Sequence, residues 1–242
     1  MIQSALNAIK AYFDALAIIK KLNLWKYFLI PVVISVITAL IIGSFSYFLS
    51  DNLGYYVAKL RPWELGKETI TTIGNILSGI AIVAIGLILY KHIVLALSSP
   101  FMSPVSLKIE EHFYGKKHQH TKSTFSESLA RGIRISLRNL GRELLLTLLI
   151  IILGFIPLIG IFSSIALFLV QAYYAGFGNM DYTLERHYKY RDSVKFVKKN
   201  KGTAIGNGII FILFLLIPII GVVLVLPFSV TAATTETMKK IQ

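Results

Sequence analysis

The sequence contains no cysteine, which excludes a disulfide framework, a thiol nucleophile and a cysteine-ligated metal site. Charged residues make up only 15% of the 242 residues, and they cluster between long apolar blocks. The motifs of common enzyme classes are also missing, because the chain has no phosphate-binding glycine loop, no HExxH and no Gly-x-Ser-x-Gly. We therefore expect a protein that is not an enzyme and holds no cofactor.

The apolar blocks contain hydroxyl and amide side chains, but no pair of Asp, Glu or His that could relay protons. Examples of these polar residues are Ser163, Ser164, Asn207 and Thr231. We interpret them as helix-packing groups, so a proton-coupled pump is disfavoured and no buried charge is expected. His118 and His120 have no third ligand at a useful spacing, so residues 116–122 are interpreted as a polar loop without a metal site.

Hydrophobic residues, in contrast, make up 55% of the chain, and the mean hydropathy is +0.68. A soluble domain of this composition would have too little polar surface to face water. Residues 27–49 and 70–97 are each long enough to cross a bilayer core of about 30 Å as a helix. The composition therefore predicts an all-α integral membrane protein of one domain, with two transmembrane helices.

Two further apolar runs each contain a proline followed three residues later by a glycine. These pairs are Pro157 with Gly160 and Pro218 with Gly221. Proline removes a helix hydrogen bond and glycine permits a left-handed turn, so each run is expected to form two helices that meet at a tip. The limbs are too short for an easy crossing of the bilayer. We therefore expect two re-entrant hairpins that penetrate the membrane in part, at residues 144–170 and 204–235.

The net charge of +13 comes from 25 Lys and Arg against 12 Asp and Glu. Membrane proteins keep Lys and Arg on the cytoplasmic side. Only the segment 50–69 balances its bases with acids, so re-entrant hairpins would place every other basic segment on one face. We therefore expect both termini and the basic loops to be cytoplasmic, and we expect membrane lipids rather than nucleic acid as partners.

The segments that flank the two predicted spans are expected to be amphipathic helices. Residues 4–21 form the first, and its apolar positions at helical spacing are Leu6, Ile9, Phe13, Leu16 and Ile19. It is expected to lie at the membrane surface or to pack under the spans. Residues 98–104 carry two prolines and are expected to break the chain before a short helix at 105–114 that ends at Gly115.

Residues 105–142 are predicted to be amphipathic and basic. Arg131, Arg134, Arg138 and Arg142 recur every three or four residues and so share one face of a helix. Two interpretations stay open. The arginines can meet lipid phosphates at the membrane surface. Alternatively, they form a cationic vestibule that concentrates a small anion at the mouth of a pore.

The order of these features resembles one known family over nearly the whole chain. Two spans are followed by a Ser-Pro-Phe break, a Pro-tipped hairpin, an Asp-Tyr-x-Leu-Glu-Arg stretch at 181–186, a basic segment and a second Pro-tipped hairpin. This order is similar to that of the CysZ-type sulfate permease family and its etoposide-induced eukaryotic relatives. The resemblance implies an oligomeric α-helical protein of the bacterial inner membrane that takes up sulfate for cysteine synthesis.

The resemblance also implies an anion site between the first amphipathic helix and the first span. Members that bind sulfate are expected to use a Gly-Leu-Arg type turn with backbone N–H groups at a helix start. The matching residues here are Asn23, Leu24, Trp25 and Lys26. Asn23 can adopt the left-handed turn, and Lys26 supplies a charge, although Trp25 stands where an arginine is expected. The alternative is that Trp25, Lys26 and Tyr27 only anchor the span at headgroup level.

Asp181, Glu185 and Arg186 follow the first predicted hairpin and permit two interpretations. Arg186 can contribute to an anion path while the acids hold it in place. Alternatively, the set is structural, and the acids pair with the arginine stripe or with the segment 195–201.

The sequence thus favours a homo-oligomeric permease or channel that moves a small oxyanion, sulfate first, without ATP. Helix N-termini at the two Pro-Gly tips would offer positive dipole ends inside the membrane. The alternative function is a membrane scaffold that interacts with lipids and does not transport.

Overall fold

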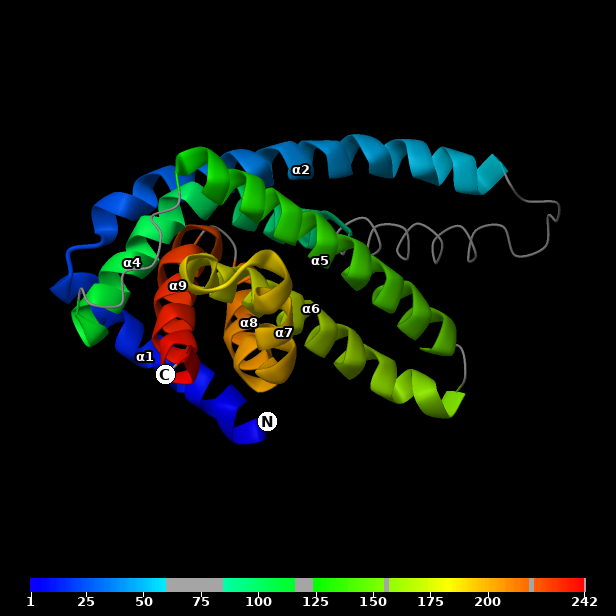
Figure 1. Ribbon diagram of the computed structural model, residues 1–242. Coiled ribbons are helices and arrows are strands. Elements are labelled where there is room, and N and C mark those ends of the chain that lie inside the picture. Colours follow the sequence, from blue (N-terminus) through cyan, green and yellow to red (C-terminus); the bar gives the residue numbers. More distant parts are fainter. Residues whose placement is uncertain (60–84, 116–123, 155–156, 218–219, 242) are drawn as a thin grey trace.

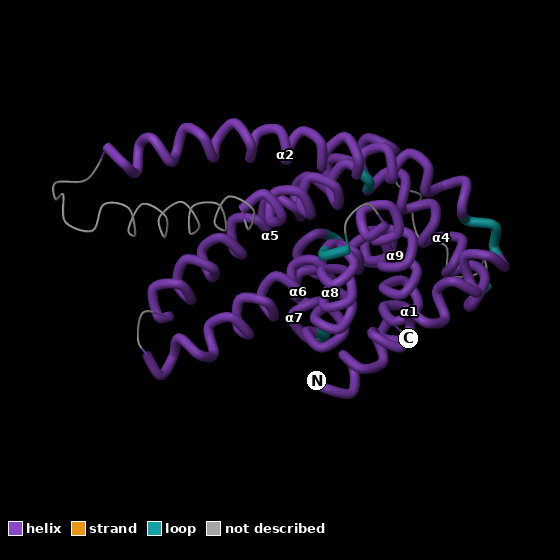
Figure 2. The backbone as a smooth tube through the Cα atoms, turned by 180° about the vertical axis from the view of Figure 1, so that it is seen from behind, coloured by secondary structure: helices purple, strands orange, loops and turns teal. Residues whose placement is uncertain are grey.

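The computed structural model describes residues 1–59, 85–115, 124–154, 157–217 and 220–241, and this part of the chain is helical and contains no strand. Its helices are α1 (Ile2–Lys21), α2 (Trp25–Lys59), Ile85–Leu97, α4 (Ser99–Tyr114), α5 (Phe125–Gly154), α6 (Pro157–His187), α7 (Tyr190–Lys199), α8 (Lys201–Leu215) and α9 (Ile220–Ile241). Figures 1 and 2 show that α1, α8, α9 and part of α6 gather in one body. The end of α5 and the beginning of α6 extend away from this body side by side. The all-α prediction is confirmed for the described residues.

Helix α2 contains the first predicted span. Trp25–Phe45 is long and apolar enough to cross a membrane, and 22% of its most hydrophobic window is buried inside the protein. Ile85–Leu97 passes the same test only together with α4, from which it is bent by 66°. The described residues therefore contain one helix able to span a bilayer, or two if the bent pair counts as one span. Most of the second predicted span, together with the His118 and His120 loop, lies outside the described residues.

The break predicted over residues 98–104 is confined to Ser98. Helix α4 begins at Ser99, with Pro100 in its first turn and Pro104 inside it, and it ends at Gly115 as predicted. Proline suits a first turn because the amide hydrogen it lacks has no helical partner there. The short helix expected to start at residue 105 was therefore placed too late.

Each Pro-Gly run separates two helices that pack against one another, as predicted: α5 against α6, and α8 against α9. The first limb does not begin at residue 144, because α5 runs unbroken for 30 residues through the basic segment and the apolar one. Pro157 is the first residue of α6, whereas Pro218 lies outside the described residues.

The prediction of a left-handed turn at the two glycines is wrong. Gly160 and Gly221 both lie inside helices, α6 and α9. A Cβ atom at Gly221 would lie 1.7 Å from the carbonyl oxygen of Phe214. Glycine is therefore needed at this position for close helix approach rather than for a turn.

Helix α1 packs on α8 and α9 through a face that the hydrophobic spacing did not predict. The buried side chains are small or aromatic, and include Ala8, Tyr12 and Ala15. Of the predicted stripe, Ile19 is buried, but Phe13 is 81% exposed. Small residues let the α1 backbone approach its neighbours closely, which leaves the larger side chains outside.

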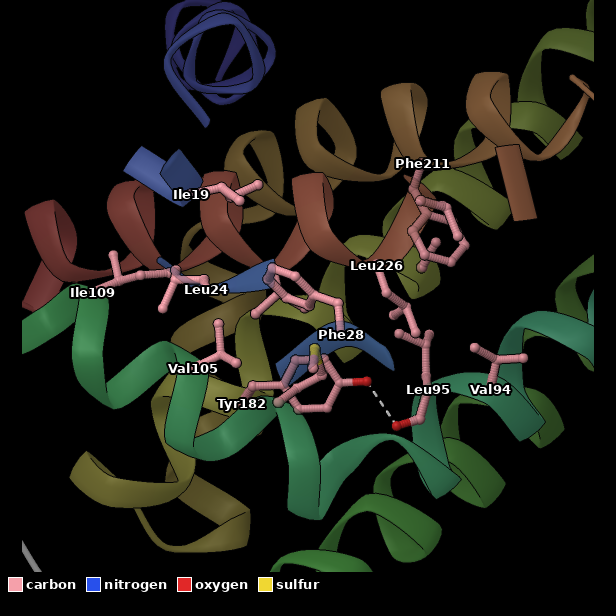
Figure 3. Close-up of a cluster of buried hydrophobic side chains, with 14 of the residues drawn as sticks. Ile19, Leu24, Phe28, Val94, Leu95, Val105, Ile109, Tyr182, Phe211 and Leu226 are labelled. Atoms are coloured by element: carbon pink, nitrogen blue, oxygen red, sulfur yellow. Dashed lines mark hydrogen bonds between the residues drawn. The ribbon is translucent and has the colours of Figure 1, made fainter. Parts of the chain in front are cut away.

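The largest core cluster among the described residues joins α1, α2, the helix Ile85–Leu97, α4, α6, α8 and α9, and Figure 3 shows its centre. Leu24 from the α1–α2 turn and Ile109 from α4 are fully buried in it. The Tyr182 hydroxyl donates a hydrogen bond to the carbonyl oxygen of Leu95 over 2.7 Å, and so ties α6 to the helix before α4. This core fixes the position of the α1–α2 turn relative to α4.

Helices α6 and α8 cross at small residues. A Cβ atom at Gly176 would lie 1.8 Å from the Ala204 carbonyl oxygen, and one at Gly208 would lie 1.7 Å from the Ala172 carbonyl oxygen. Both helices thus present an alanine and a glycine four residues apart, the spacing that lets two membrane helices touch along their backbones.

Asn207 confirms the packing role assigned to polar residues in the apolar blocks. Its side-chain oxygen accepts a hydrogen bond from Asn179 at 2.8 Å, and its side-chain nitrogen donates to the Ser229 carbonyl at 3.0 Å. The Tyr12 hydroxyl donates to its backbone carbonyl over 2.7 Å. One residue of α8 is therefore bonded to α1, α6 and α9.

Candidate functional site

The turn between α1 and α2 has the left-handed residue that the sequence predicted. Asn23 has φ 49°. Its N–H donates to the carbonyl of Lys20 at 3.2 Å, and the Leu24 N–H donates to that of Ile19 at 3.0 Å. Because the side chain of Leu24 is buried and its N–H is engaged, Leu24 anchors the turn rather than offering a donor to a ligand.

The start of α2 carries the groups that could still bind an anion, namely backbone N–H groups and a lysine. Trp25 and Lys26 occupy its first turn, where backbone N–H groups have no partner within the helix and the helix dipole is positive. The Lys26 ammonium lies 5.4 Å from the centre of the Tyr27 ring, and that of Lys108 lies 4.8 Å from it. Two cations therefore flank the first turn of α2.

Lys108 was missed by sequence reasoning. It is the only lysine of α4 and lies more than 80 residues along the chain from Lys26. Its place beside Tyr27 follows from the packing of α2 on α4, which no local pattern shows. It supplies a second charge where the family resemblance predicts an arginine.

The aromatic residues at this turn also fit the anchoring interpretation. Trp25 is 41% exposed, and its ring meets that of Phe28 edge-on with 6.4 Å between the ring centres. A half-exposed indole beside a lysine at the start of a spanning helix is typical of the headgroup level. The turn can therefore hold the helix in the interface and present cations at the same place.

Asn23→Ala is expected to lower the free energy of unfolding by about 1 kcal/mol, because a residue with a Cβ atom and no polar side chain resists the left-handed conformation. Asn23→Gly should leave stability unchanged or raise it slightly, since glycine adopts this conformation freely. Thermal unfolding of the purified variants in detergent measures both. An alanine variant as stable as the glycine variant would contradict the assignment.

Arg131, the first arginine of the predicted stripe, is partly buried and held by protein groups. Its guanidinium donates to both carboxylate oxygens of Asp181 at 2.9 Å, to the Ser193 hydroxyl at 2.6 Å and to the Tyr188 carbonyl at 2.8 Å. The predicted pairing of an acid with the stripe is therefore confirmed for Asp181. Arg131 joins α5 to α6 and α7.

The next two arginines lie over aromatic rings of neighbouring helices. The guanidinium of Arg134 is 4.1 Å from the centre of the Tyr190 ring, and that of Arg138 is 5.1 Å from that of Phe177. Such stacking is favourable for arginine and leaves its N–H groups able to donate at the ring edge. The stripe thus faces α6 and α7 rather than only the solvent.

Arg186 is almost fully buried, and its donors are bound by protein groups. It pairs with Glu110 at 3.0 Å, and it also donates to the Ser106 hydroxyl at 2.7 Å and to the Tyr182 carbonyl at 2.9 Å. This arrangement favours the structural interpretation of Arg186.

Glu185 accepts hydrogen bonds from the hydroxyls of Ser103 and Ser128. Burial raises the pKa of its carboxyl group above the ordinary value. Glu185 therefore links α6 to α4 and α5 through hydroxyl groups and does not pair with the segment 195–201.

The expectation of no buried charge is wrong. Glu143, at the junction of the basic and apolar parts of α5, is inaccessible to solvent and pairs with Lys91 and with His92, the latter at 2.9 Å. The Lys91 ammonium also donates to the carbonyl of Gln171 at 3.3 Å. Lys91 and His92 belong to the second predicted span, and their partner lies about 50 residues away, so the cluster has no signal in local sequence.

The candidate anion residues form two separate groups. Asn23 to Lys26 lie at the α1–α2 turn, which Figures 1 and 2 show at one end of the molecule, whereas Arg134 and Arg138 of α5 lie over rings of α7 and α6. The structure therefore brings Lys108 to the first group and does not bring the arginine stripe there.

The described residues contain an apolar helix long enough to span a bilayer and a helical hairpin with exposed apolar side chains, which are features of α-helical membrane proteins. A family model described as "Sulfate transporter CysZ/Etoposide-induced protein 2.4" matches residues 11–225, and the chain belongs to this family. The resemblance stated from the sequence is thereby confirmed. No curated protein matches the chain. Membership supports a role in membrane transport and is in keeping with the prediction that the chain is not an enzyme.

Proposed function

We propose that the protein is a permease or channel for a small oxyanion, most simply sulfate, in the bacterial inner membrane. The observation that carries the proposal is the pair of lysines, Lys26 and Lys108, beside the open N-terminal turn of α2. Backbone N–H groups, a positive dipole end and two ammonium groups are what a doubly charged oxyanion requires. The family name, which specifies sulfate, supports the same substrate.

Exposed apolar side chains support insertion of the first hairpin. The apolar end of α5 exposes Leu145 (69%) and Leu148 (58%), and the facing part of α6 exposes Phe162 (66%). Residues 144–154 of α5 rise roughly 16 Å at 1.5 Å per residue, which is about half of the hydrocarbon core. This hairpin therefore enters the membrane and turns near its midplane.

The second hairpin differs, because most of it is covered by the protein. Phe211 on α8 and Val225 and Val230 on α9 are fully buried, and exposure rises only near the tip, where Leu216 is 60% exposed. Hairpins that stop at mid-depth do not seal a path through the bilayer alone, so several copies of the chain enclose it as a homo-oligomer. The basic segments and both termini then lie on the cytoplasmic side.

Uptake of labelled sulfate into liposomes that contain the purified protein tests this function. The double variant Lys26→Ala/Lys108→Ala should lower uptake at subsaturating sulfate by about tenfold or more, since each charge-assisted hydrogen bond contributes about 1.5–3 kcal/mol. Lys20→Ala/Lys21→Ala is the matched control, because it removes two exposed lysines from the adjacent end of α1. This control should transport like the native protein.

The second candidate function is a lipid-interacting scaffold without transport. It is favoured by the partly buried Arg131 and the buried Arg186, whose hydrogen-bond donors are taken up by protein groups. Uptake by the folded native protein that equals uptake by empty vesicles would decide for the scaffold. If uptake is saturable but both double variants reduce it equally, the proposal that the anion binds at the first turn of α2 is refuted.

A further inference from the structure

A basic pocket of about 620 Å³ lies at the base of the first hairpin, between α5, α6 and the junction of α7 with α8. Five basic side chains line it: Arg138, Arg142, Lys198, Lys199 and Lys201. No Asp or Glu is among the described residues that line the pocket. The sequence showed the arginines and the lysines as separate segments, and the fold places them around one cavity.

The other walls of the pocket are apolar and aromatic. Leu146 and Leu169 come from the two limbs of the hairpin, each 38% exposed, and Tyr173 and Tyr174 continue the wall along α6. The volume falls in the range of about 300–1,000 Å³ that is typical of sites for organic ligands. Apolar walls next to a cluster of cations suit an amphiphile better than a hydrated inorganic ion.

Among the described residues that line the pocket, no acid balances these cations, and the nearby Glu143 is paired with Lys91 and His92. Burial, together with the neighbouring charge of Arg142, lowers the pKa of Arg138 below the ordinary arginine value. The Arg138 guanidinium is held in place over the Phe177 ring and by a hydrogen bond of 2.7 Å to the side chain of Asn139. An anion in the pocket would relieve the repulsion between these positive charges.

The pocket also lies at the level of the hairpin where a lipid headgroup is expected. Directly beyond Arg142, the surface of α5 changes to exposed leucines and isoleucines, of which Leu145 and Ile152 are more than half exposed. An acyl chain along these residues would bring its phosphate to the level of Arg138 and Arg142.

We infer that this pocket binds the phosphate headgroup of an anionic phospholipid, with the acyl chains along the outer face of the α5–α6 hairpin. Arg138 and Arg142 contact the phosphate from α5, and Lys198, Lys199 and Lys201 close over it from α7 and α8. The inference rests on the proposed membrane insertion of the hairpin, but not on transport.

Binding of phosphatidylglycerol to the full-length protein in a neutral detergent tests the inference, with phosphatidylcholine as the reference lipid. Lys198→Gln/Lys199→Gln/Lys201→Gln should bind phosphatidylglycerol at least about tenfold more weakly, as expected for the loss of several cations near an anionic headgroup. Lys10→Gln/Lys20→Gln/Lys195→Gln is the matched control, because it removes three exposed lysines that do not line the pocket. Its affinity should stay within about twofold of native on the same scale.

Inorganic phosphate and sulfate, added as competitors, distinguish a lipid from a free anion. Failure of either ion to displace the lipid at equal concentration supports the inference, whereas displacement overturns it and assigns the pocket to a free oxyanion. If both triple variants bind phosphatidylglycerol equally more weakly than the native protein, the inference is also overturned, because the lipid would then respond to net positive charge and not to the pocket. If the pocket triple fails to fold, Arg142→Gln and its control Arg191→Gln, both exposed arginines, give the same comparison. Sulfate uptake by Lys26→Ala/Lys108→Ala is measured separately, so failure of one proposal is not failure of the other.

Discussion

Gly208→Ala is expected to destabilise the protein by about 3 kcal/mol or more, although the same change in an open helix stabilises. The added Cβ atom would lie 1.7 Å from the carbonyl oxygen of Ala172, and this oxygen belongs to the backbone of α6. A backbone atom moves only if the helix moves, so α6 and α8 must separate along their crossing. The measurement is the free energy of unfolding in detergent, with size-exclusion chromatography to detect aggregation.

Gly141→Ala provides the control for this prediction. Gly141 also lies within a helix, α5, but nothing lies within 4 Å of a Cβ atom added there. Alanine should therefore stabilise the protein by about 0.5–1 kcal/mol through its helix propensity alone. Equal effects of the two substitutions would show that α6 and α8 do not touch along their backbones.

Glu143→Leu is expected to cost about 3–5 kcal/mol, which is the usual cost of breaking a buried ion pair by removing one partner. The carboxylate of Glu143 is the shared partner of Lys91 and His92, and all three side chains are at most 3% exposed. Without it, the Lys91 ammonium is left in the core with only the Gln171 carbonyl as acceptor among its described contacts. Chemical unfolding of the variant measures the loss.

A second substitution separates charge from packing. Lys91→Met removes the stranded cation, so Lys91→Met/Glu143→Leu should recover a large part of the stability lost in Glu143→Leu alone. Asp14→Asn on the exposed side of α1 removes one carboxylate elsewhere and should change stability by less than about 0.5 kcal/mol. A double variant no more stable than the single one would show that the cost comes from lost packing and not from an unpaired charge.

The features that were predicted correctly from the sequence are those that a single residue imposes on its neighbours in the chain. Proline acts on the residues beside it, so Pro157 fixed the start of a helix and the prolines after Ser98 marked a bend. Asn23 tolerates a left-handed conformation through its own side chain, and it was placed correctly in the turn before α2. Each of these features depends on a few neighbouring residues.

The features that the sequence did not predict depend on residues far apart in the chain. Glu143 lies between the predicted basic segment, which ends at residue 142, and the predicted hairpin, which begins at residue 144, and its burial arises only when α5 packs beside Lys91. Lys108 meets Tyr27 through the packing of α4 on α2, and the lysines at the end of α7 line the same pocket as Arg142 because of the fold. Periodicity also misassigned the buried face of α1, because close contact through alanines has no hydrophobic signature.

The hydrogen bonds of Asn207 set an order in which the protein can be completed during synthesis. Tyr12, Asn179 and Asn207 leave the ribosome before Ser229, whose carbonyl accepts the Asn207 side-chain nitrogen. Until α9 is made, the side-chain nitrogen of Asn207 lies among apolar helices without the Ser229 carbonyl as its acceptor. Figure 1 shows α1 and α9 near one another, and both helices bond to Asn207. A nascent chain that ends after α8 therefore lacks the acceptor for the Asn207 side-chain nitrogen.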